Sequence, residues 1–177
     1  MDVENLRYID LNAFSEPLAK RIEVFEMIGD NKLIDPQQVF QVINFFYSLK
    51  HLQEITITNG ELNYISDNSF YLKYHSNQSL IIDLSNNNLT QFSFGRHSLV
   101  GTNRPIELDL RDNQLTVLER EIFRPFLSSN TKNSINLSAN PINCQDCHIK
   151  WLVEDKHIFE DNVFEVRCQH YVITGFM

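Results

Sequence analysis

The chain of 177 residues has few glycines, few cysteines and no long apolar run. Its five glycines form neither a G-x-G-x-x-G motif nor a P-loop, so no glycine-rich loop is available to hold a nucleotide phosphate. No serine lies in G-x-S-x-G, and the six histidines are scattered along the chain, which leaves no recognisable nucleophile with its base. No apolar run reaches the roughly 18 to 20 residues that cross a bilayer. These absences predict a non-catalytic protein with no cofactor and no membrane-spanning segment.

Basic residues are also scarce. Lys and Arg number 15 against 23 Asp and Glu, which gives a net charge of -8. That charge opposes attraction to phosphate backbones and anionic lipids, so nucleic acid is not expected as a partner. The first residues, Met1 to Glu4, are acidic and lack the basic and apolar regions of a signal peptide. If the protein is secreted, we expect its signal to lie outside this sequence.

A repeat is the dominant feature of the sequence. In Ser79 to Thr90, two apolar residues flank an acidic one, and an asparagine and a leucine follow. The pattern recurs with a period of 26 or 27 residues, and its equivalent apolar positions are Ile57, Leu84, Leu110 and Leu137. Alternate residues of a short strand point the same way, and a period of this length is typical of a solenoid whose repeats bury their apolar faces against each other.

An asparagine follows three of the predicted strands, at Asn87, Asn113 and Asn140. A side-chain amide both donates and accepts hydrogen bonds. It can therefore pair with backbone groups of adjacent repeats that would otherwise be buried without a partner. We expect these asparagines to form a ladder along the molecule.

These residues resemble the leucine-rich repeat family, whose pattern is L-x-x-L-x-L-x-x-N-x-L. The match covers most of the chain, although Ser79, Pro105 and Lys132 replace the first leucine of the pattern in three units. The resemblance implies an α/β solenoid with a curved parallel sheet on its concave side and helices or turns on its convex side. About five repeats would occupy residues 1–143, the first of them partial. Asp35 to Leu49 and Arg120 to Leu127 are expected to be short helices or turns on the convex side.

Phenylalanine recurs where the convex side of the core is expected, at Phe14, Phe40, Phe70 and Phe123. One large flat ring per repeat can stack on the next and fill that side. His97 stands at the position expected between the last two. We interpret it as a substitution in this column, with Phe94 taking over, or as a loop residue beside a shifted Phe94, rather than as a functional histidine.

The pattern changes after the last repeat, from Asn140-Pro141 to a C-x-x-C pair and Trp151. This segment resembles the cysteine-rich C-terminal flank of extracellular leucine-rich repeat proteins, in which a helix tied down by disulfides covers the apolar face of the final repeat. The resemblance implies a cap over residues 144–177, a disulfide between Cys144 and Cys168, and an unpaired Cys147. The family usually has C-x-C here, and no fourth cysteine precedes Met177, so the flank is expected to be truncated or unusual.

Two metal-based interpretations of the same residues remain open. Cys144 to His148 satisfies C-x-x-C-H, a haem-attachment motif, although nothing else indicates a haem pocket. Cys144, Cys147, Cys168 and His170 have the ligand types of a tetrahedral zinc site. An intracellular, zinc-stabilised scaffold is therefore an alternative, since disulfides rarely persist inside cells.

Three N-x-S/T sequons begin at Asn77, Asn88 and Asn136. They fit a secreted glycoprotein, although such triplets also arise by chance. A glycan on Asn136 would project over the concave sheet.

The concave sheet is the surface with which this family generally binds other proteins. The repeat register predicts that its residues form an acidic band with Arg111 at the edge. Asp83 and Asp109 could approach each other there, but an open face would solvate both and would not tune a catalytic carboxylate. A basic or polar protein partner with salt-sensitive association is expected, and a merely solvated surface is the alternative. The predicted binding residues are Glu26, Glu54, Thr56, Asp83, Glu107, Asp109 and Arg111.

The sequence thus predicts a non-catalytic protein-protein interaction module, located outside the cell or on its surface. A carrier or regulatory subunit of an enzyme complex is the alternative. The irregular repeats, together with the segments Asn140 to Cys144 and Ile149 to Leu152, are similar to arthropod proteins named after the non-catalytic leucine-rich subunit of shrimp luciferase. That resemblance implies a sequence group and no luciferase activity.

Overall fold

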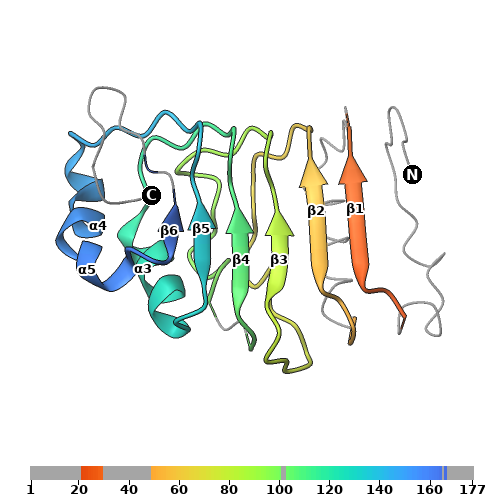
Figure 1. Cartoon of the computed structure of the whole chain (residues 1–177). Coiled ribbons are helices and arrows are strands. Elements are labelled where there is room, and N and C mark those ends of the chain that lie inside the picture. Colours follow the sequence, from red (N-terminus) through yellow and green to blue (C-terminus); the bar gives the residue numbers. More distant parts are fainter. Residues whose placement is uncertain (1–20, 30–48, 101–102, 165, 167–177) are drawn as a thin grey trace.

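A single parallel sheet of six strands organises the molecule (Figure 1). The computed structural model describes residues 21–29, 49–100, 103–164 and 166. The order of the strands across the sheet is their order along the chain, and with its helices the molecule is α/β. The strands are β1 (Val24–Ile28), β2 (Glu54–Thr58), β3 (Leu80–Asp83), β4 (Ile106–Asp109), β5 (Ser134–Asn136) and β6 (Val163–Phe164). The helices are α3 (Arg120–Ser129), α4 (Lys150–Glu154) and α5 (Lys156–Phe159), with a 3-10 turn, η2, at Cys147–Ile149.

The strands pair in the register that the sequence repeat predicts. One face of the sheet carries a continuous apolar row, because alternate residues of a strand share a face. This row consists of Phe25, Ile55, Ile82, Leu108, Ile135 and Val163. Ile57, Leu84, Leu110 and Leu137, the positions that define the repeat, are buried beside it.

The predicted asparagine ladder is confirmed. The Nδ2 group of Asn113 donates to the carbonyl oxygens of Leu84 at 3.0 Å and Leu110 at 3.1 Å, and its Oδ1 accepts from the Leu89 amide at 3.0 Å. Asn87 and Asn140 make the equivalent bonds in the units before and after it. Each amide thus joins two successive units through backbone groups that have no access to water.

A left-handed residue follows each strand from β2 to β5 at a fixed place in the repeat. Asn59, Asn86, Asp112 and Ala139 have φ angles of 55°, 53°, 53° and 58°. Asn and Asp tolerate this conformation better than other side chains. Ala139 lacks such a polar side chain and is therefore the strained member of the series.

The side of the core opposite the strands contains the aromatic column. The rings of Phe94 and Phe123 meet edge to face with centroids 5.1 Å apart. Phe94 pairs with Ile65 in a parallel bridge, so it occupies the place of Ile65, and the prediction that it takes over from His97 is wrong. The buried Leu99 follows Phe94 by five residues, as Phe70 follows Ile65. The exposed His97 donates its backbone N–H to Asp67 Oδ1 at 2.7 Å. That bond is the main reason why the pKa of Asp67 is lowered. Phe14 and Phe40 lie outside the described residues.

Helix α3 extends two residues beyond the predicted segment, from Arg120 to Ser129. Ile122, Phe123, Phe126 and Leu127 are its buried residues. The other predicted convex segment lies outside the described residues except for its last residue, Leu49, which is buried.

The C-terminal segment extends the sheet as well as covering its end. Strand β6 pairs with β5, and α4 and α5 lie at the end of the sheet opposite β1 (Figure 1). The buried Trp151 donates its indole N–H to the Leu118 carbonyl at 2.9 Å and meets Phe159 edge to face. The Arg124 guanidinium binds Asp155 at 2.6 Å and so ties α3 to the junction of α4 and α5. The sequence predicted the helical cover but not the additional strand.

Candidate functional site

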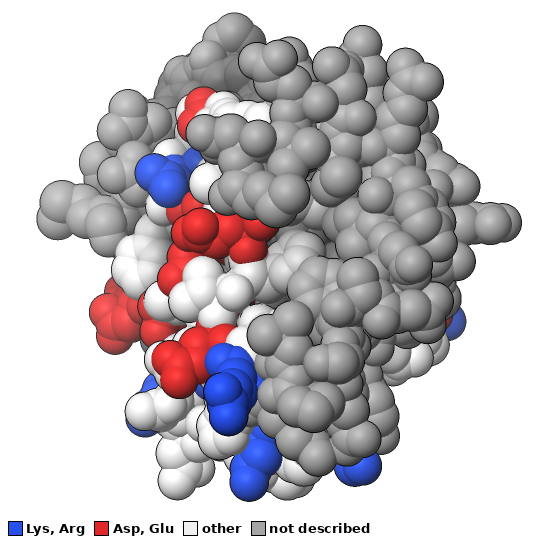
Figure 2. All heavy atoms as spheres, turned by 90° about the vertical axis from the view of Figure 1, so that its right-hand side faces the viewer, with Lys and Arg blue, Asp and Glu red and all other residues white. Residues whose placement is uncertain are grey.

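The polar face of the sheet contains the predicted binding residues, and the strand pairing brings most of them together. Glu54, Ile81 and Glu107 are direct neighbours on β2, β3 and β4. A second row on the same face runs from Glu26 to Thr56, Asp83, Asp109 and Asn136. We term these two rows the strand face. Acidic side chains gather on the described surface seen from the β1 end (Figure 2).

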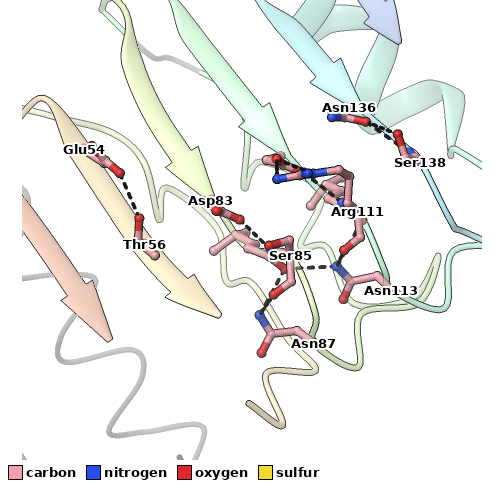
Figure 3. A network of polar contacts seen from close by, with 12 residues as sticks. Glu54, Thr56, Asp83, Ser85, Asn87, Arg111, Asn113, Asn136 and Ser138 are labelled. Atoms are coloured by element: carbon pink, nitrogen blue, oxygen red, sulfur yellow. Dashed lines mark hydrogen bonds and ion pairs between the residues drawn. The ribbon is translucent and has the colours of Figure 1, made fainter. Parts of the chain in front are cut away.

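Three members of the second row accept hydrogen bonds from the turn that follows their strand (Figure 3). Asp83 Oδ1 accepts from the Ser85 amide at 2.9 Å, and Asn136 Oδ1 accepts from the Ser138 amide at 3.1 Å. Asp109 accepts the same bond from Arg111 at 3.0 Å. These residues therefore have a structural role at the strand ends, which agrees with the alternative interpretation of a merely solvated surface. The bond to Ser85 uses Oδ1 of Asp83 and does not involve Oδ2.

Arg111 neutralises one of the acidic residues. Its Nε and Nη2 atoms each lie 2.7 Å from Asp109 Oδ2, and Nε also lies 2.9 Å from Oδ1. The fork geometry makes this a two-point ion pair on one strand end. The other acidic residues of the strand face are Glu26 on β1, Glu54 on β2, Asp83 on β3 and Glu107 on β4.

Glu26 and Glu107 differ from these residues because the carboxylate of neither has a hydrogen-bond or ion-pair partner among the described residues. Both are exposed. In the described part of the chain, the Glu54 carboxylate accepts a hydrogen bond from the Thr56 hydroxyl alone, at 3.1 Å. Thr56 itself is 7% exposed, so it offers little surface to a partner, contrary to its place among the predicted binding residues.

An apolar side chain lies between the two glutamates of the first row. Ile81 is 43% exposed and is paired on one side with Glu54 and on the other with Glu107. Val24, at the β1 end of the same row, is 49% exposed. Ile81 was not among the predicted binding residues, although an isoleucine at a solvent position between charged residues was the available signal.

The sequons fall at three different places. Asn77 and Asn88 are exposed in loops, whereas Asn136 is half-buried on the strand face. Asn136 Oδ1 accepts from both the amide and the hydroxyl of Ser138, which fixes its side chain over β5.

The cysteine segment separates into a bonded thiol and a free one. Cys144 is disulfide-bonded and packs against the core, and Cys147 is free and exposed. Cys168 and His170 lie outside the described residues, so the predicted pairing of Cys144 with Cys168 stays a prediction. A disulfide-bonded Cys144 supplies neither a thiolate to zinc nor a thioether to haem, which removes one group from each metal-based interpretation.

A small polar cluster surrounds the free thiol. His148 Nδ1 lies 2.7 Å from Asp146 Oδ1 and 3.8 Å from Cys147 Sγ. The hydrogen bond and charge of Asp146 raise the pKa of His148, and the backbone and side-chain bonds from His148 lower the pKa of Asp146. The three ligand atoms lie within 4.8 Å of one another, but they come from consecutive residues, of which Cys147 and His148 are exposed. A metal ion would have to displace the bond between Asp146 and His148.

No helix in the described part of the chain has the length and apolar character that a membrane crossing requires. No protein-family model matches the chain, and no curated protein matches it significantly.

Proposed function

We propose that the chain is a leucine-rich repeat solenoid that binds a protein partner through the strand face. Support for the solenoid comes from the sequential parallel strands, the asparagine ladder and the left-handed residue at one fixed place in each unit. A repeat of this kind stacks each unit on the last and leaves one face of its sheet available to partners.

The row formed by Glu54, Ile81 and Glu107 carries the binding proposal. Binding surfaces commonly combine an apolar contact with surrounding polar groups that exclude water and set specificity. Here an exposed isoleucine lies between two carboxylates, of which Glu107 has no partner among the described residues. The complementary partner presents an apolar side chain flanked by lysine or arginine. Salt slows the association of this partner with the strand face, because dissolved ions screen the attraction between opposite charges.

The same proposal places the protein outside the cell or on its surface. The disulfide at Cys144 is consistent with an oxidising compartment. Asn77 and Asn88 are exposed sequon residues that a glycosylating enzyme could reach.

The strand face can be tested with variants that leave the turn hydrogen bonds intact. The wild-type chain is used to select a partner from a display library of extracellular proteins, and the affinity of that partner is then measured. We expect the double variant Glu54→Lys, Glu107→Lys to weaken binding by about a hundredfold, and Ile81→Ser by about tenfold. The reason is that each single substitution removes a contact worth about 1.4 kcal/mol or more, which is a factor of about ten in affinity.

The matched control reverses two exposed glutamates away from the strand face, Glu61 and Glu121. The double variant Glu61→Lys, Glu121→Lys makes the same change in net charge and should bind as the wild type does. Equal loss in both double variants would show that total charge, rather than this surface, determines binding. Capture of a catalytic subunit or of a cell-surface ectodomain distinguishes the two kinds of partner.

A further inference from the structure

A pocket of about 230 Å³ opens at the edge of the sheet where the strands begin. Three successive units line it with the segments that precede β2, β3 and β4. Basic and neutral polar side chains dominate this lining, and no carboxylate is among them. The lining residues are Lys50, His51, Leu52, Gln53, Tyr74, His75, Ser76, Gln78 and Arg104.

Arg104 is the buried cation of this pocket. The residue is 6% exposed. Its guanidinium donates to the carbonyl oxygens of Leu52 at 2.6 Å, Gln78 at 3.0 Å and Ser79 at 3.0 Å. These acceptors are neutral, and no carboxylate pairs with Arg104 in the described part of the chain. Burial lowers the pKa of Arg104, which reflects the cost of holding an uncompensated charge away from water.

Further donors surround the mouth of the pocket. Lys50 and His51, which precede β2, and His75, which precedes β3, are all exposed. The Nδ1 atom of His75 lies 3.1 Å from the Asn103 carbonyl. Since a carbonyl only accepts, Nδ1 carries the proton, and Nε2 can donate to a ligand when the ring holds a second proton. Lys73 adds a positive charge 5.6 Å above the Tyr74 ring.

We propose that this pocket binds a tetrahedral oxyanion, the phosphate or sulfate group of a small organic molecule or the free ion. Three of the five N–H groups of Arg104 donate to backbone carbonyls, which leaves two for a ligand oxygen, and lysine supplies a point charge. The concentration of cations here is opposite to the net charge of -8 on the whole chain. The pocket volume of about 230 Å³ is several times the roughly 30 Å³ that one water molecule occupies in the liquid. The pocket is therefore larger than one oxyanion needs and leaves room for a small substituent.

The test uses calorimetric titration of the full chain at constant ionic strength, so that general screening does not change. The ligands are inorganic phosphate, glucose 6-phosphate and glucose 6-sulfate, and neutral glucose is the reference. We expect saturable binding to one site with a Kd of about 1 mM or tighter for at least one of the three anions. Comparable affinity for phosphate and the esters identifies the free ion as sufficient, whereas tighter binding of an ester identifies an organic ligand.

The variants leave Arg104 unchanged, because its guanidinium donates to three backbone carbonyls and its loss would destabilise the fold. The double variant Lys50→Gln, His75→Gln changes exposed side chains only and should weaken binding by at least about tenfold. The control Lys132→Gln, His157→Gln removes the same two residue types from exposed positions outside the pocket and should leave the affinity unchanged. Equal weakening in both variants, or no saturable binding by any of the three anions up to about ten times the expected Kd, would overturn the proposal.

An independent readout is the NMR signal of each histidine ring. On addition of the bound anion, we expect the ring signals of His51 and His75 to shift, whereas that of His157 should stay constant. Uniform shifts of all the ring signals would contradict a local site, because they would indicate a general effect of added salt.

Discussion

Asn113 illustrates how much of the structure depends on single amides. It donates to the carbonyls of Leu84 and Leu110 and accepts from the Leu89 amide, and it is 1% exposed. We predict that Asn113→Ala lowers the free energy of unfolding by about 3 kcal/mol, because buried backbone groups in two units lose their partners. Urea denaturation measures this change.

Gln114 provides the control for that prediction. Its side chain is exposed, and its backbone N–H bonds to the Leu89 carbonyl whatever the side chain is. Gln114→Ala should therefore change the stability by less than about 0.5 kcal/mol. Equal losses in the two variants would mean that helix or strand propensity, and not the amide bonds, explains the effect.

The pair formed by His148 and Asp146 gives a pH-dependent prediction. The folded pKa of His148 is raised by Asp146, so this contribution to stability is complete below the unfolded pKa of His148 and is lost as the pH rises through its folded pKa. The folded pKa of Asp146 is lowered, so its contribution is present above its unfolded pKa and is lost as the pH falls through its folded pKa. The pair therefore stabilises the fold only between these limits.

An NMR titration of the His148 ring tests this coupling. We expect its pKa to lie above the ordinary value of about 6.5 and to return toward that value in Asp146→Asn, since the carboxylate charge is lost. Asp161→Asn, which changes an exposed carboxylate of the same cap, should leave the His148 pKa where it was. An identical shift in the two variants would assign the effect to overall charge.

At the scale of elements, the turns after the strands are the strained parts of the fold. Ala139 occupies a left-handed conformation with a φ of 58°, where Asn59, Asn86 and Asp112 stand in the other units. We predict that Ala139→Asn raises the free energy of unfolding by about 1 kcal/mol, because this conformation is costly for alanine and asparagine tolerates it. Thermal and chemical denaturation would both detect the gain.

The reverse substitution completes that test. Asp112 is exposed at the equivalent position, and Asp112→Ala should lose about the amount that Ala139→Asn gains. A gain from both substitutions, or a loss from both, would show that charge or solvation rather than backbone conformation controls these turns.

The strands and the ladder could be predicted because their residue types repeat. Ile57, Leu84, Leu110 and Leu137 define both the strand positions and the register, and a one-residue shift would have exposed the whole apolar set. Helix α3 was predicted within two residues of its end. The left-handed turns were missed because Asn, Asp and Ala share that place, although the spacing of 26 or 27 residues was there to be found.

Other features had no periodic signal. Strand β6 has two residues, too few for an alternation, and its pairing depends on how the cap docks on β5. The acidic residues of the strand face were predicted, whereas the exposure of Ile81 and the burial of Thr56 depend on neighbours in space. The pocket around Arg104 combines three segments that precede different strands, and they share no common motif.

At the scale of the whole molecule, the state of the cysteines distinguishes the proposed extracellular protein from an intracellular one. We predict that alkylation without reductant adds one label, at Cys147, and that alkylation after reduction adds three. The reason is that Cys144 is disulfide-bonded and Cys147 is free. Intact mass and peptide mapping measure the labels, and three labels without reductant would contradict the disulfide.

The order of the strands has a consequence for how the molecule assembles. Each strand from β2 to β5 lies between its predecessor and its successor along the chain, so no strand must wait for a distant segment to arrive before it can dock. Contacts of short sequence separation favour rapid folding, and growth can start at any pair of strands and proceed in both directions. Damage at one edge would accordingly fray the sheet from that side inward, while the pairs farthest from it remained closed.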